Sequence, residues 1–247
     1  MIRIRGLRKV FPPDKVALDG VDLDISAGDC VMVIGQSGAG KTTLLRCLNR
    51  LVEPTAGEVQ LNGSLVTGAS PEALRLVRRQ IGMIFQHFNL VKRASVLQNV
   101  LAGRLGHVPG LLSLVGRFPE RDRILAMACL RQVGLEGFAS RRADTLSGGE
   151  QQRVAIARAL AQEPKVILAD EPTASLDPKL TESIMGILQR INTESRMTLV
   201  VSQHMLETAL TYGTRIVGLR QGRLVFDGPP HAITPTIVED IYQGGVQ

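Results

Sequence analysis

The first third of the chain alternates apolar and polar side chains over short stretches. The alternation occurs at Ile2–Arg5, at Val21–Ile25 and at Val59–Leu61, and the last stretch ends in the turn pair Asn62-Gly63. Such a stretch presents one face to a core and the other to water, and strands of this kind tend to pair antiparallel. The pattern predicts an antiparallel sheet near the start of the chain.

Farther along, the apolar runs become continuous and segments of helical spacing separate them. The runs typical of buried parallel strands are Val31–Ile34, Ile81–Phe85, Val166–Ala169, Thr198–Ser202 and Ile216–Leu219. The segments with helical spacing are Arg121–Val133, Glu150–Gln162, Thr181–Ile191 and Met205–Tyr212. Strand and helix in alternation predict an α/β fold with a mostly parallel sheet flanked by helices.

The stretch from Phe88 to Gly149 differs, because it has helical patterns and loops without a convincing strand. We interpret it as part of a helical insertion. The expected organisation is one domain over residues 1–247. In it, residues 1–87 and 163–247 form the α/β core with the antiparallel β subdomain, and residues 88–162 form the insertion.

A glycine-rich loop lies between the Val31–Ile34 run and a helical segment that continues to Leu48. It consists of Gly35, Gln36, Ser37, Gly38, Ala39, Gly40, Lys41, Thr42 and Thr43, and it fits the P-loop pattern. Its glycines would let backbone N–H groups face a polyphosphate. Lys41 would place its charge on the β- and γ-phosphates, and the Thr42 hydroxyl would ligate magnesium. The position at a helix N-terminus also favours an anion.

Two acids follow the Val166–Ala169 run. Ligands of open α/β sheets bind at the carboxyl ends of the strands. Asp170 is therefore suited to hold magnesium, and Glu171 is suited to orient or deprotonate an attacking water. Two adjacent acids at a strand end are otherwise consistent with a solvated turn, and it is the P-loop that favours the functional interpretation.

A second loop with the features of an anion site lies far along the chain from the first. Ser147 and Glu150 have the spacing of a capping box, and a strongly helical segment follows. Gly148 and Gly149 are more than a cap requires, since glycines cost helix stability and are useful where something must come close. The pattern indicates a helix N-terminus open to an anion, and an ordinary capped helix is the alternative.

Composition narrows the function classes. The formal net charge of +6 is compatible with attraction to nucleotides, nucleic acid or anionic lipid, or merely with a well-solvated surface, so the charge alone decides nothing. The arginines lack the interleaved aromatics of a single-strand nucleic-acid groove, so we expect no nucleic acid as a partner. Cys30, Cys47 and Cys129 are odd in number and have no metal-type spacing, which predicts reduced, buried thiols. No apolar stretch approaches the ~20 residues that span a bilayer, and we expect a cytosolic protein.

The ordered motifs of the chain resemble those of ABC-transporter ATPase subunits. These motifs are the P-loop, Gln86 after the Ile81–Phe85 run, Leu146–Gln151, Asp170-Glu171, Ser175–Asp177 and His204 after the Thr198–Ser202 run. The match covers essentially the whole chain. The resemblance implies a P-loop NTPase core with an antiparallel β subdomain and a helical signature subdomain, and ATP and Mg²⁺ as ligands. It also implies a head-to-tail dimer of two copies of the chain.

Roles for individual residues follow from this resemblance. The signature residues Ser147, Gly148 and Gly149 of one copy would cap the γ-phosphate on the P-loop of the other, and Asp177 would cross the interface. A single copy should then show Ser147–Gly149 facing solvent, far from its own Lys41.

Three further residues receive roles in the same way. Gln86 would touch magnesium and His204 would contact the γ-phosphate. Phe11 lies where the family has an aromatic side chain stacked on adenine. Packing in a core is the alternative for both Phe11 and His204.

A narrower resemblance is to the ATPase subunits of phosphonate importers, with relatives that serve phosphite or hypophosphite. It rests on Phe88–Val91, Asn99–Gly106, Gly110–Arg123 and Ile216–Pro229, whereas Glu150 stands where those importers often have Gln.

This narrower resemblance implies uptake of a phosphonate or a phosphite-like oxyanion. It also implies membrane permease subunits, a periplasmic phosphonate-binding protein as an indirect partner, and a peripheral position at the cytoplasmic face of the inner membrane. The broader resemblance to ABC ATPases implies that at least one of Phe88, Leu90 and Val91 lines the groove for the permease, and core packing is the alternative for these residues. The alternatives are the ATPase of another transporter and a soluble ABC ATPase acting on DNA or ribosomes.

Overall fold

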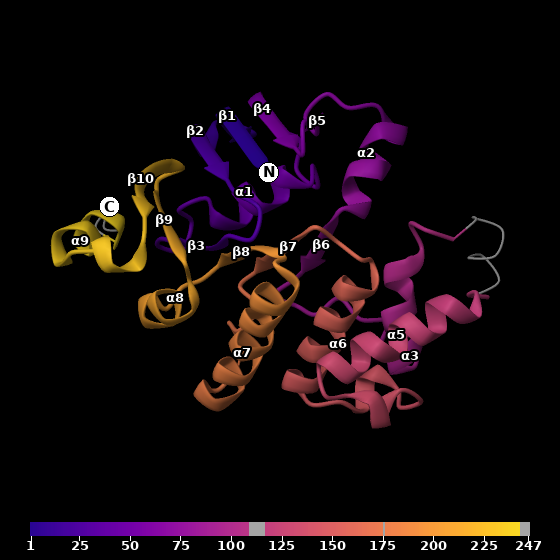
Figure 1. Cartoon of the computed structure of the whole chain (residues 1–247). Helices are drawn as coiled ribbons and strands as arrows, with labels where there is room; N and C mark the ends of the chain where they lie inside the picture. Colours follow the sequence, from indigo (N-terminus) through magenta and orange to yellow (C-terminus); the bar gives the residue numbers. More distant parts are fainter. Residues whose placement is uncertain (109–116, 175, 243–247) are drawn as a thin grey trace.

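The computed structural model describes residues 1–108, 117–174 and 176–242. Its smaller sheet has the order β2-β1-β4-β5 and every pairing in it is antiparallel, as predicted (Figure 1). The strands are β1 (Ile2–Phe11), β2 (Lys15–Ile25), β4 (Ala56–Leu61) and β5 (Ser64–Leu65). β1 is longer than its alternating stretch and carries Phe11 to the far end of the sheet, where β2 turns back.

The larger sheet has the order β10-β9-β3-β8-β7-β6, and it is parallel except for the antiparallel pair of β9 and β10. Its strands are β3 (Cys30–Ile34), β6 (Ile81–Ile84), β7 (Val166–Asp170), β8 (Thr198–Ser202), β9 (Arg215–Arg220) and β10 (Arg223–Gly228). All five predicted buried strands are present. β10 was not predicted, because it is a partly exposed edge strand without a continuous apolar run.

Eight α-helices connect these strands in the described part of the chain. They are α1 (Lys41–Leu48), α2 (Pro71–Arg79), α3 (Val96–Leu101), α5 (Glu120–Gln132), α6 (Gly148–Ala161), α7 (Pro178–Ser195), α8 (Leu206–Tyr212) and α9 (Pro235–Tyr242). The helical patterns predicted α5, α6, α7 and α8 to within a few residues. They missed α2, which buries only Val77 and depends on its N-cap Ser70 and on Pro71 in its first turn.

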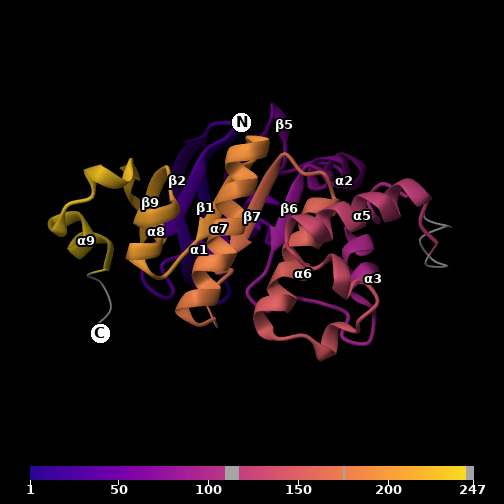
Figure 2. The same cartoon turned by 60° about the horizontal axis from the view of Figure 1, so that its bottom comes forward.

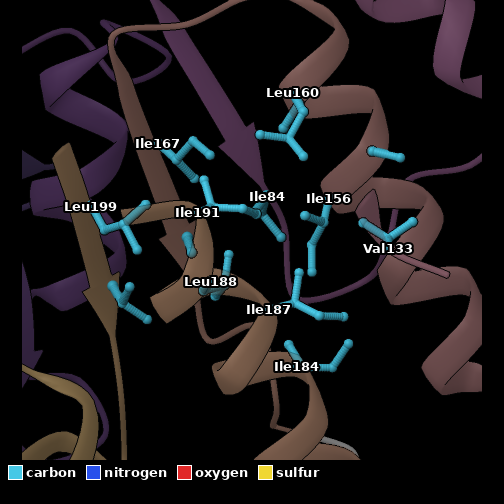
Figure 3. Close-up of a cluster of buried hydrophobic side chains, with 14 of the residues drawn as sticks. Ile84, Val133, Ile156, Leu160, Ile167, Ile184, Ile187, Leu188, Ile191 and Leu199 are labelled. Carbon is cyan, nitrogen blue, oxygen red and sulfur yellow. The ribbon is translucent and has the colours of Figure 1, made fainter. Parts of the chain in front are cut away.

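Two hydrophobic clusters lie on opposite faces of the parallel sheet, because alternate strand residues point to opposite sides. Val31 and Leu168 belong to the cluster shared with α1 and the antiparallel sheet. Ile167 and Leu199 belong to the cluster that α6 and α7 cover (Figure 3). The sheet is thus covered on both faces, as its continuous apolar runs predicted.

The region of residues 88–162 is helical in its described part, where α3 and α5 pack against α6. It extends beyond the β6 edge of the sheet, on the side opposite α9 (Figures 1 and 2). Leu130 of α5 and Ile156 of α6 belong to the same cluster as Ile167 of β7, so the region shares its core with the parallel sheet. Part of the Gly110–Arg123 stretch and Ser175 lie outside the described residues.

The three cysteines are buried and form no disulfide, as predicted. Burial raises the pKa of Cys30 and of Cys129 to about 11 and that of Cys47 to about 12, so these thiols stay protonated near neutral pH. Within the described residues, every helix is too short or too polar to cross a bilayer.

Candidate functional site

A cavity of about 450 Å³ opens where the P-loop meets the carboxyl ends of the parallel strands. It gathers residues from the end of β1, from the P-loop and from the segments after β6, β7 and β8. Its lining consists of Phe11, Lys15, Ala17, Ser37, Gly38, Gly40, Lys41, Thr42, Thr43, Gln86, Glu171 and His204. Many residues predicted for one site from distant parts of the sequence therefore lie together.

Glycine is needed at the three glycine positions of the P-loop for different physical reasons. A Cβ at Gly35 would lie 2.3 Å from the carbonyl oxygen of Leu219, and one at Gly40 would lie 2.5 Å from that of Ala17. These two glycines let the loop pack against neighbouring backbone. Gly38 has a φ of +83° and no neighbour within 4 Å, so it needs only the left-handed conformation and leaves the cavity open beside it.

Lys41 lies at the floor of the cavity and is only 4% exposed. Its Nζ donates to the carbonyl oxygens of Gly35 at 2.7 Å and of Gln36 at 3.0 Å, and it lies 3.9 Å from Glu171 Oε1. Burial lowers the pKa of Lys41, while the carboxylates of Glu171 and Asp170 act against that shift. A buried ammonium of this kind favours an anionic ligand.

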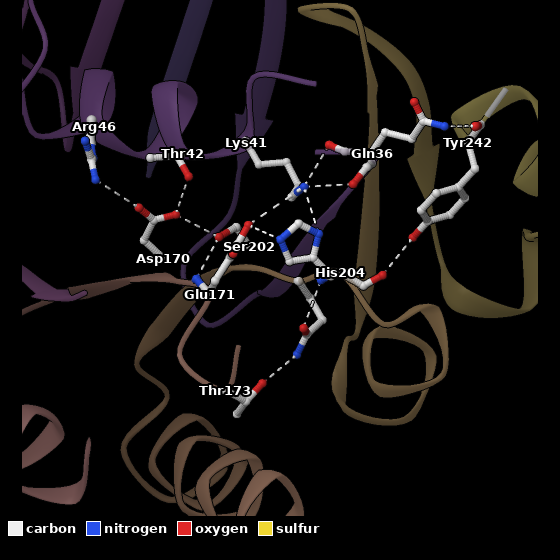
Figure 4. A network of polar contacts seen from close by, with 12 residues as sticks. Gln36, Lys41, Thr42, Arg46, Asp170, Glu171, Thr173, Ser202, His204 and Tyr242 are labelled. Carbon is white, nitrogen blue, oxygen red and sulfur yellow. Dashed lines mark hydrogen bonds and ion pairs between the residues drawn. The ribbon is translucent and has the colours of Figure 1, made fainter. Parts of the chain in front are cut away.

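Asp170 is nine-tenths or more buried and has hydroxyl groups as neighbours. Its Oδ1 accepts from Thr42 Oγ1 at 2.8 Å and from Ser202 Oγ at 3.1 Å, while Arg46 approaches its Oδ2 at 3.6 Å (Figure 4). The alternative of a solvated turn is wrong for this acid and for the similarly buried Glu171.

The pairing of Thr42 with Asp170 bears on magnesium. The described residues contain no cluster of three His, Cys or acidic side chains that could hold a metal ion alone. Mg²⁺, however, usually takes one or two protein oxygens, several waters and the phosphates of the substrate. A hydroxyl and a carboxylate oxygen 2.8 Å apart at the edge of the P-loop fit that requirement, and Gln86 lines the same cavity.

Glu171 and His204 form a close pair beside Lys41. His204 Nε2 lies 2.5 Å from Glu171 Oε1, and His204 Nδ1 lies 3.5 Å from Lys41 Nζ (Figure 4). Glu171 has a φ of +47°, a left-handed conformation that costs a non-glycine residue about 1–3 kcal/mol. Its backbone N–H donates to Ser202 Oγ at 2.9 Å, which helps to hold this conformation.

Phe11 and Gln36 differ in where they point. Phe11 is partly exposed at the cavity, and the Lys9 ammonium lies 4.9 Å from its ring centroid. The alternative of core packing is therefore wrong for Phe11, and it is also wrong for His204, whose side chain is 41% exposed. The Gln36 side chain turns away from the cavity and donates to the backbone carbonyl of Tyr242.

The signature segment does not line the cavity of its own chain. Ser147 caps α6 in a capping box with Glu150, as predicted. Ser147 and Gly148 are exposed, but Gly149 is buried. A Cβ at Gly149 would lie 2.9 Å from a methyl group of Leu180, so this glycine packs closely against α7. The expectation that all of Ser147–Gly149 faces solvent is thus wrong for Gly149. Asp177 is exposed and caps α7.

Several residues of the site escaped the sequence analysis. Ser202 forms hydrogen bonds with both Asp170 and Glu171. This contact could have been inferred from the sequence, because β8 pairs with β7 in a register that sets Ser202 beside Asp170. Gln203 accepts from the backbone N–H of His204 at 2.9 Å and donates to Thr173 Oγ1 at 3.2 Å. Tyr242 donates from its hydroxyl to the carbonyl oxygen of His204 at 3.3 Å. Only the folded chain brings these partners together.

The chain has sequence relatives among ABC transporter proteins. Residues 18–174 match the family model described as ABC transporter. The phosphonates import ATP-binding protein PhnC of Staphylococcus haemolyticus is 50% identical over 241 residues, covering 98% of this chain and 94% of the relative. A second such protein, PhnC 2 of Halalkalibacterium halodurans, is 48% identical over 243 residues, covering 98% of this chain and all of the relative.

Solved structures agree with the fold. The dimeric ATP-binding cassette MJ0796, bound to ADP and Pi in a post-hydrolysis state, superimposes with a TM-score of 0.83 at 36% identity, over 94% of this chain and 100% of that one. The cassette MJ1267 in its ADP conformation gives a TM-score of 0.84 at 28% identity, over 97% of each chain. The chain therefore belongs to the ABC transporter family, with the fold of its ATP-binding cassettes.

Proposed function

We infer that the protein is the ATP-hydrolysing subunit of an ABC importer for phosphonates or a phosphite-like phosphorus oxyanion. The observation that carries the ATPase assignment is the convergence of Lys41, Glu171 and His204 on the cavity beside the P-loop. The phosphonate assignment rests on relatives about half identical over nearly the whole chain that are named for phosphonate import.

In the proposed mechanism the cavity binds ATP. Phe11 offers an aromatic face to the adenine, and the P-loop backbone around Gly38 and the Lys41 ammonium receive the phosphates. Thr42, Asp170 and Gln86 would hold Mg²⁺, which neutralises charge on the phosphate oxygens. These assignments give each end of the nucleotide a separate set of contacts.

Glu171 is the proposed general base. Its carboxylate lies between Lys41 and His204, where it would orient a water for attack on the γ-phosphate and accept a proton from it. His204 would donate from its imidazole to the γ-phosphate or to Glu171. The strained backbone of Glu171 is consistent with a role that requires one fixed orientation of the carboxylate.

Two copies of the chain would form the working unit. Ser147 and Gly148 are exposed at the N-terminus of α6 and contribute nothing to the cavity of their own chain. In a head-to-tail pair they would approach the γ-phosphate held by the partner, together with the backbone of Gly149, and Asp177 would lie at the interface. The related cassette MJ0796 is described as dimeric, which supports this arrangement.

Membrane permease subunits would receive the conformational change at the cytoplasmic face of the inner membrane, and a periplasmic binding protein would deliver the cargo to them. A hollow of about 410 Å³ between the sheet and the helical region is a candidate for permease docking. Phe85 and Asn89 line it, whereas Phe88, Leu90 and Val91 do not. If this hollow is the docking groove, its lining differs from our sequence-based expectation.

The variant Glu171→Gln tests the proposed base. We expect its ATP hydrolysis to fall by at least about 100-fold, because the amide cannot accept the proton, while ATP still binds. Phosphate release and nucleotide affinity measure the two effects separately. Glu72→Gln, an exposed position on α2, is the control and should hydrolyse at the wild-type rate. Wild-type hydrolysis by Glu171→Gln would contradict the assignment.

Growth tests the cargo. A strain that lacks the gene should fail to grow when a phosphonate is the sole phosphorus source and should grow normally on phosphate. Phosphite and hypophosphite as sole sources separate the related cargoes. Normal growth of the deletion strain on the whole panel would refute this class of cargo, and the ATPase assignment would stand independently.

A further inference from the structure

The last described helix, α9, is fastened to the strand that borders the P-loop. Ile241 is 1% exposed, and a Cβ at Gly218 of β9 would lie 2.6 Å from its side chain, so the two elements are in close contact. Arg220 at the end of β9 donates to the backbone carbonyl of Asp240 at 3.1 Å and also pairs with its carboxylate. The end of α9 is therefore fixed relative to the sheet.

Tyr242, at the end of α9, connects two loops of the nucleotide site. Its backbone carbonyl accepts from the Gln36 side chain, which belongs to the P-loop. Its hydroxyl donates to the backbone carbonyl of His204 at 3.3 Å. Figure 4 shows the tyrosine ring between these two loops, outside the group formed by Lys41, Glu171 and His204.

The two loops that Tyr242 connects carry groups that face each other across the site. Gln36 offers its carbonyl oxygen to Lys41 Nζ at 3.0 Å, and His204 reaches Lys41 at 3.5 Å and Glu171 at 2.5 Å. The contacts of Lys41 with Gln36 and with His204 therefore depend on the distance between the P-loop and the loop that carries His204. A bridge from one loop to the other therefore acts on the position of the imidazole relative to the base.

Packing alone does not account for the orientation of the tyrosine hydroxyl. The ring of Tyr242 packs against the cluster covered by α6 and α7, which phenylalanine would do equally well. Instead, the hydroxyl is directed at one main-chain carbonyl. Burial raises the pKa of Tyr242, so the phenol remains a protonated donor over the pH range of an ATPase assay.

We propose that Tyr242 is a positioning residue for ATP hydrolysis, which holds the His204 loop against the P-loop from the end of α9. This inference rests on the proposed role of His204. Tyr242 does not line the cavity, and its hydroxyl donates to the main chain of His204, so the hydroxyl acts on the reaction through the loop that carries His204.

The test is a double-mutant cycle between Tyr242→Phe and His204→Ala, with steady-state ATP hydrolysis as the readout. Tyr242→Phe should lower kcat about 2- to 10-fold, as expected for one hydrogen bond, with the KM for ATP within about 2-fold of wild type. In the His204→Ala background the same change should have no further effect, because the group that it positions is gone.

Tyr212→Phe is the matched control, since Tyr212 is the only other tyrosine of the chain. The described structure gives its hydroxyl no hydrogen bond, so its loss should leave kcat unchanged. Gln36→Leu removes the other half of the bridge and should also lower kcat. Thermal melting of Tyr242→Phe should match wild type, which separates positioning from loss of fold.

Two results would overturn the proposal. The first is a wild-type kcat for Tyr242→Phe. The second is an equal loss of kcat from Tyr242→Phe with and without His204, which would show that the tyrosine acts elsewhere. A wild-type rate for His204→Ala alone would instead refute the proposed role of His204, and the cycle therefore tells the two failures apart.

Discussion

The N-termini of α1 and α6 are both predicted anion sites, and the structure completes them differently. The N-terminus of α1 has no side-chain cap, and the P-loop in front of it opens into a cavity with the buried Lys41. The N-terminus of α6 is capped within its own chain by Ser147 and Glu150, and it lines no part of that cavity. The α1 site opens into a cavity of its own chain, whereas we propose that the α6 site receives its ligand from a second copy.

Under the proposed head-to-tail arrangement, this difference would account for two phosphate-binding loops so distant in sequence. The backbone N–H groups at the N-terminus of α1 and the adjacent Lys41 ammonium favour an anion, although the ammonium also donates to the carbonyl oxygens of Gly35 and Gln36. Ser147 and Gly148 at α6 are satisfied or solvated without an anion, and they remain available at the surface.

Replacing Lys41 with alanine should damage the α1 site most. If Lys41 binds the phosphates as proposed, removing this buried cation should weaken ATP binding by about 10- to 100-fold, since hydrogen bonds to charged groups contribute about 1.5–3 kcal/mol. Calorimetric titration with ATP measures the change. Lys15→Ala is the control, because Lys15 lines the same cavity but is exposed, and its loss should cost much less. Equal affinities for the two variants would contradict the assigned role of Lys41.

Replacing Phe11 with alanine should have a smaller effect on the same site. Loss of an aromatic stack on adenine corresponds to about 1–3 kcal/mol of binding free energy. Phe11→Tyr keeps the ring and should bind ATP like wild type. If Phe11→Ala weakens ATP and inorganic triphosphate equally, the ring does not contact the base.

Replacing Gly149 with alanine should affect the fold near α6 more than the chemistry. The new methyl group would displace the side chain of Leu180, which should lower the free energy of unfolding by about 1 kcal/mol. At Gly148 the nearest side-chain atom would lie 3.8 Å away, an ordinary contact, so Gly148→Ala is the control. Urea denaturation compares the two variants, and equal stabilities would show that Leu180 moves without cost.

Much of the fold and of the α1 site follows from local sequence. Continuous apolar runs identified the five buried strands, and the P-loop, Asp170 and Glu171 follow such runs directly. Chain order alone therefore places them at one edge of a parallel sheet. The structure adds that both acids are buried and that His204 reaches Glu171.

The parts that sequence could not predict depend on distant packing. Tyr242 contacts the P-loop and the His204 loop because α9 is held on β9, where Ile241 packs on Gly218 and Arg220 bonds Asp240. Gly149 faces Leu180, a residue of another helix, so the same glycine pattern suits a close contact within the chain as well as an open site. The edge strand β10 buries too few side chains to produce a clear hydrophobic period, whereas α2 is amphipathic and its helical period was overlooked.

The central claim is that the α6 site acts on the nucleotide of a second copy. In the Glu171→Gln background, where hydrolysis should not limit the complex, we compare Ser147→Arg with Ser95→Arg. Ser95 is the N-cap of α3 in an equivalent capping box, so both changes remove the same kind of cap.

Light scattering of these variants with ATP and Mg²⁺ is the most direct measurement. The Glu171→Gln chain and its Ser95→Arg derivative should have twice the 26.7 kDa mass of one chain. The Ser147→Arg derivative should remain at the mass of one chain while it still binds ATP. An ATP-dependent dimer of the Ser147→Arg derivative, as stable as that of the Ser95→Arg control, would contradict the account.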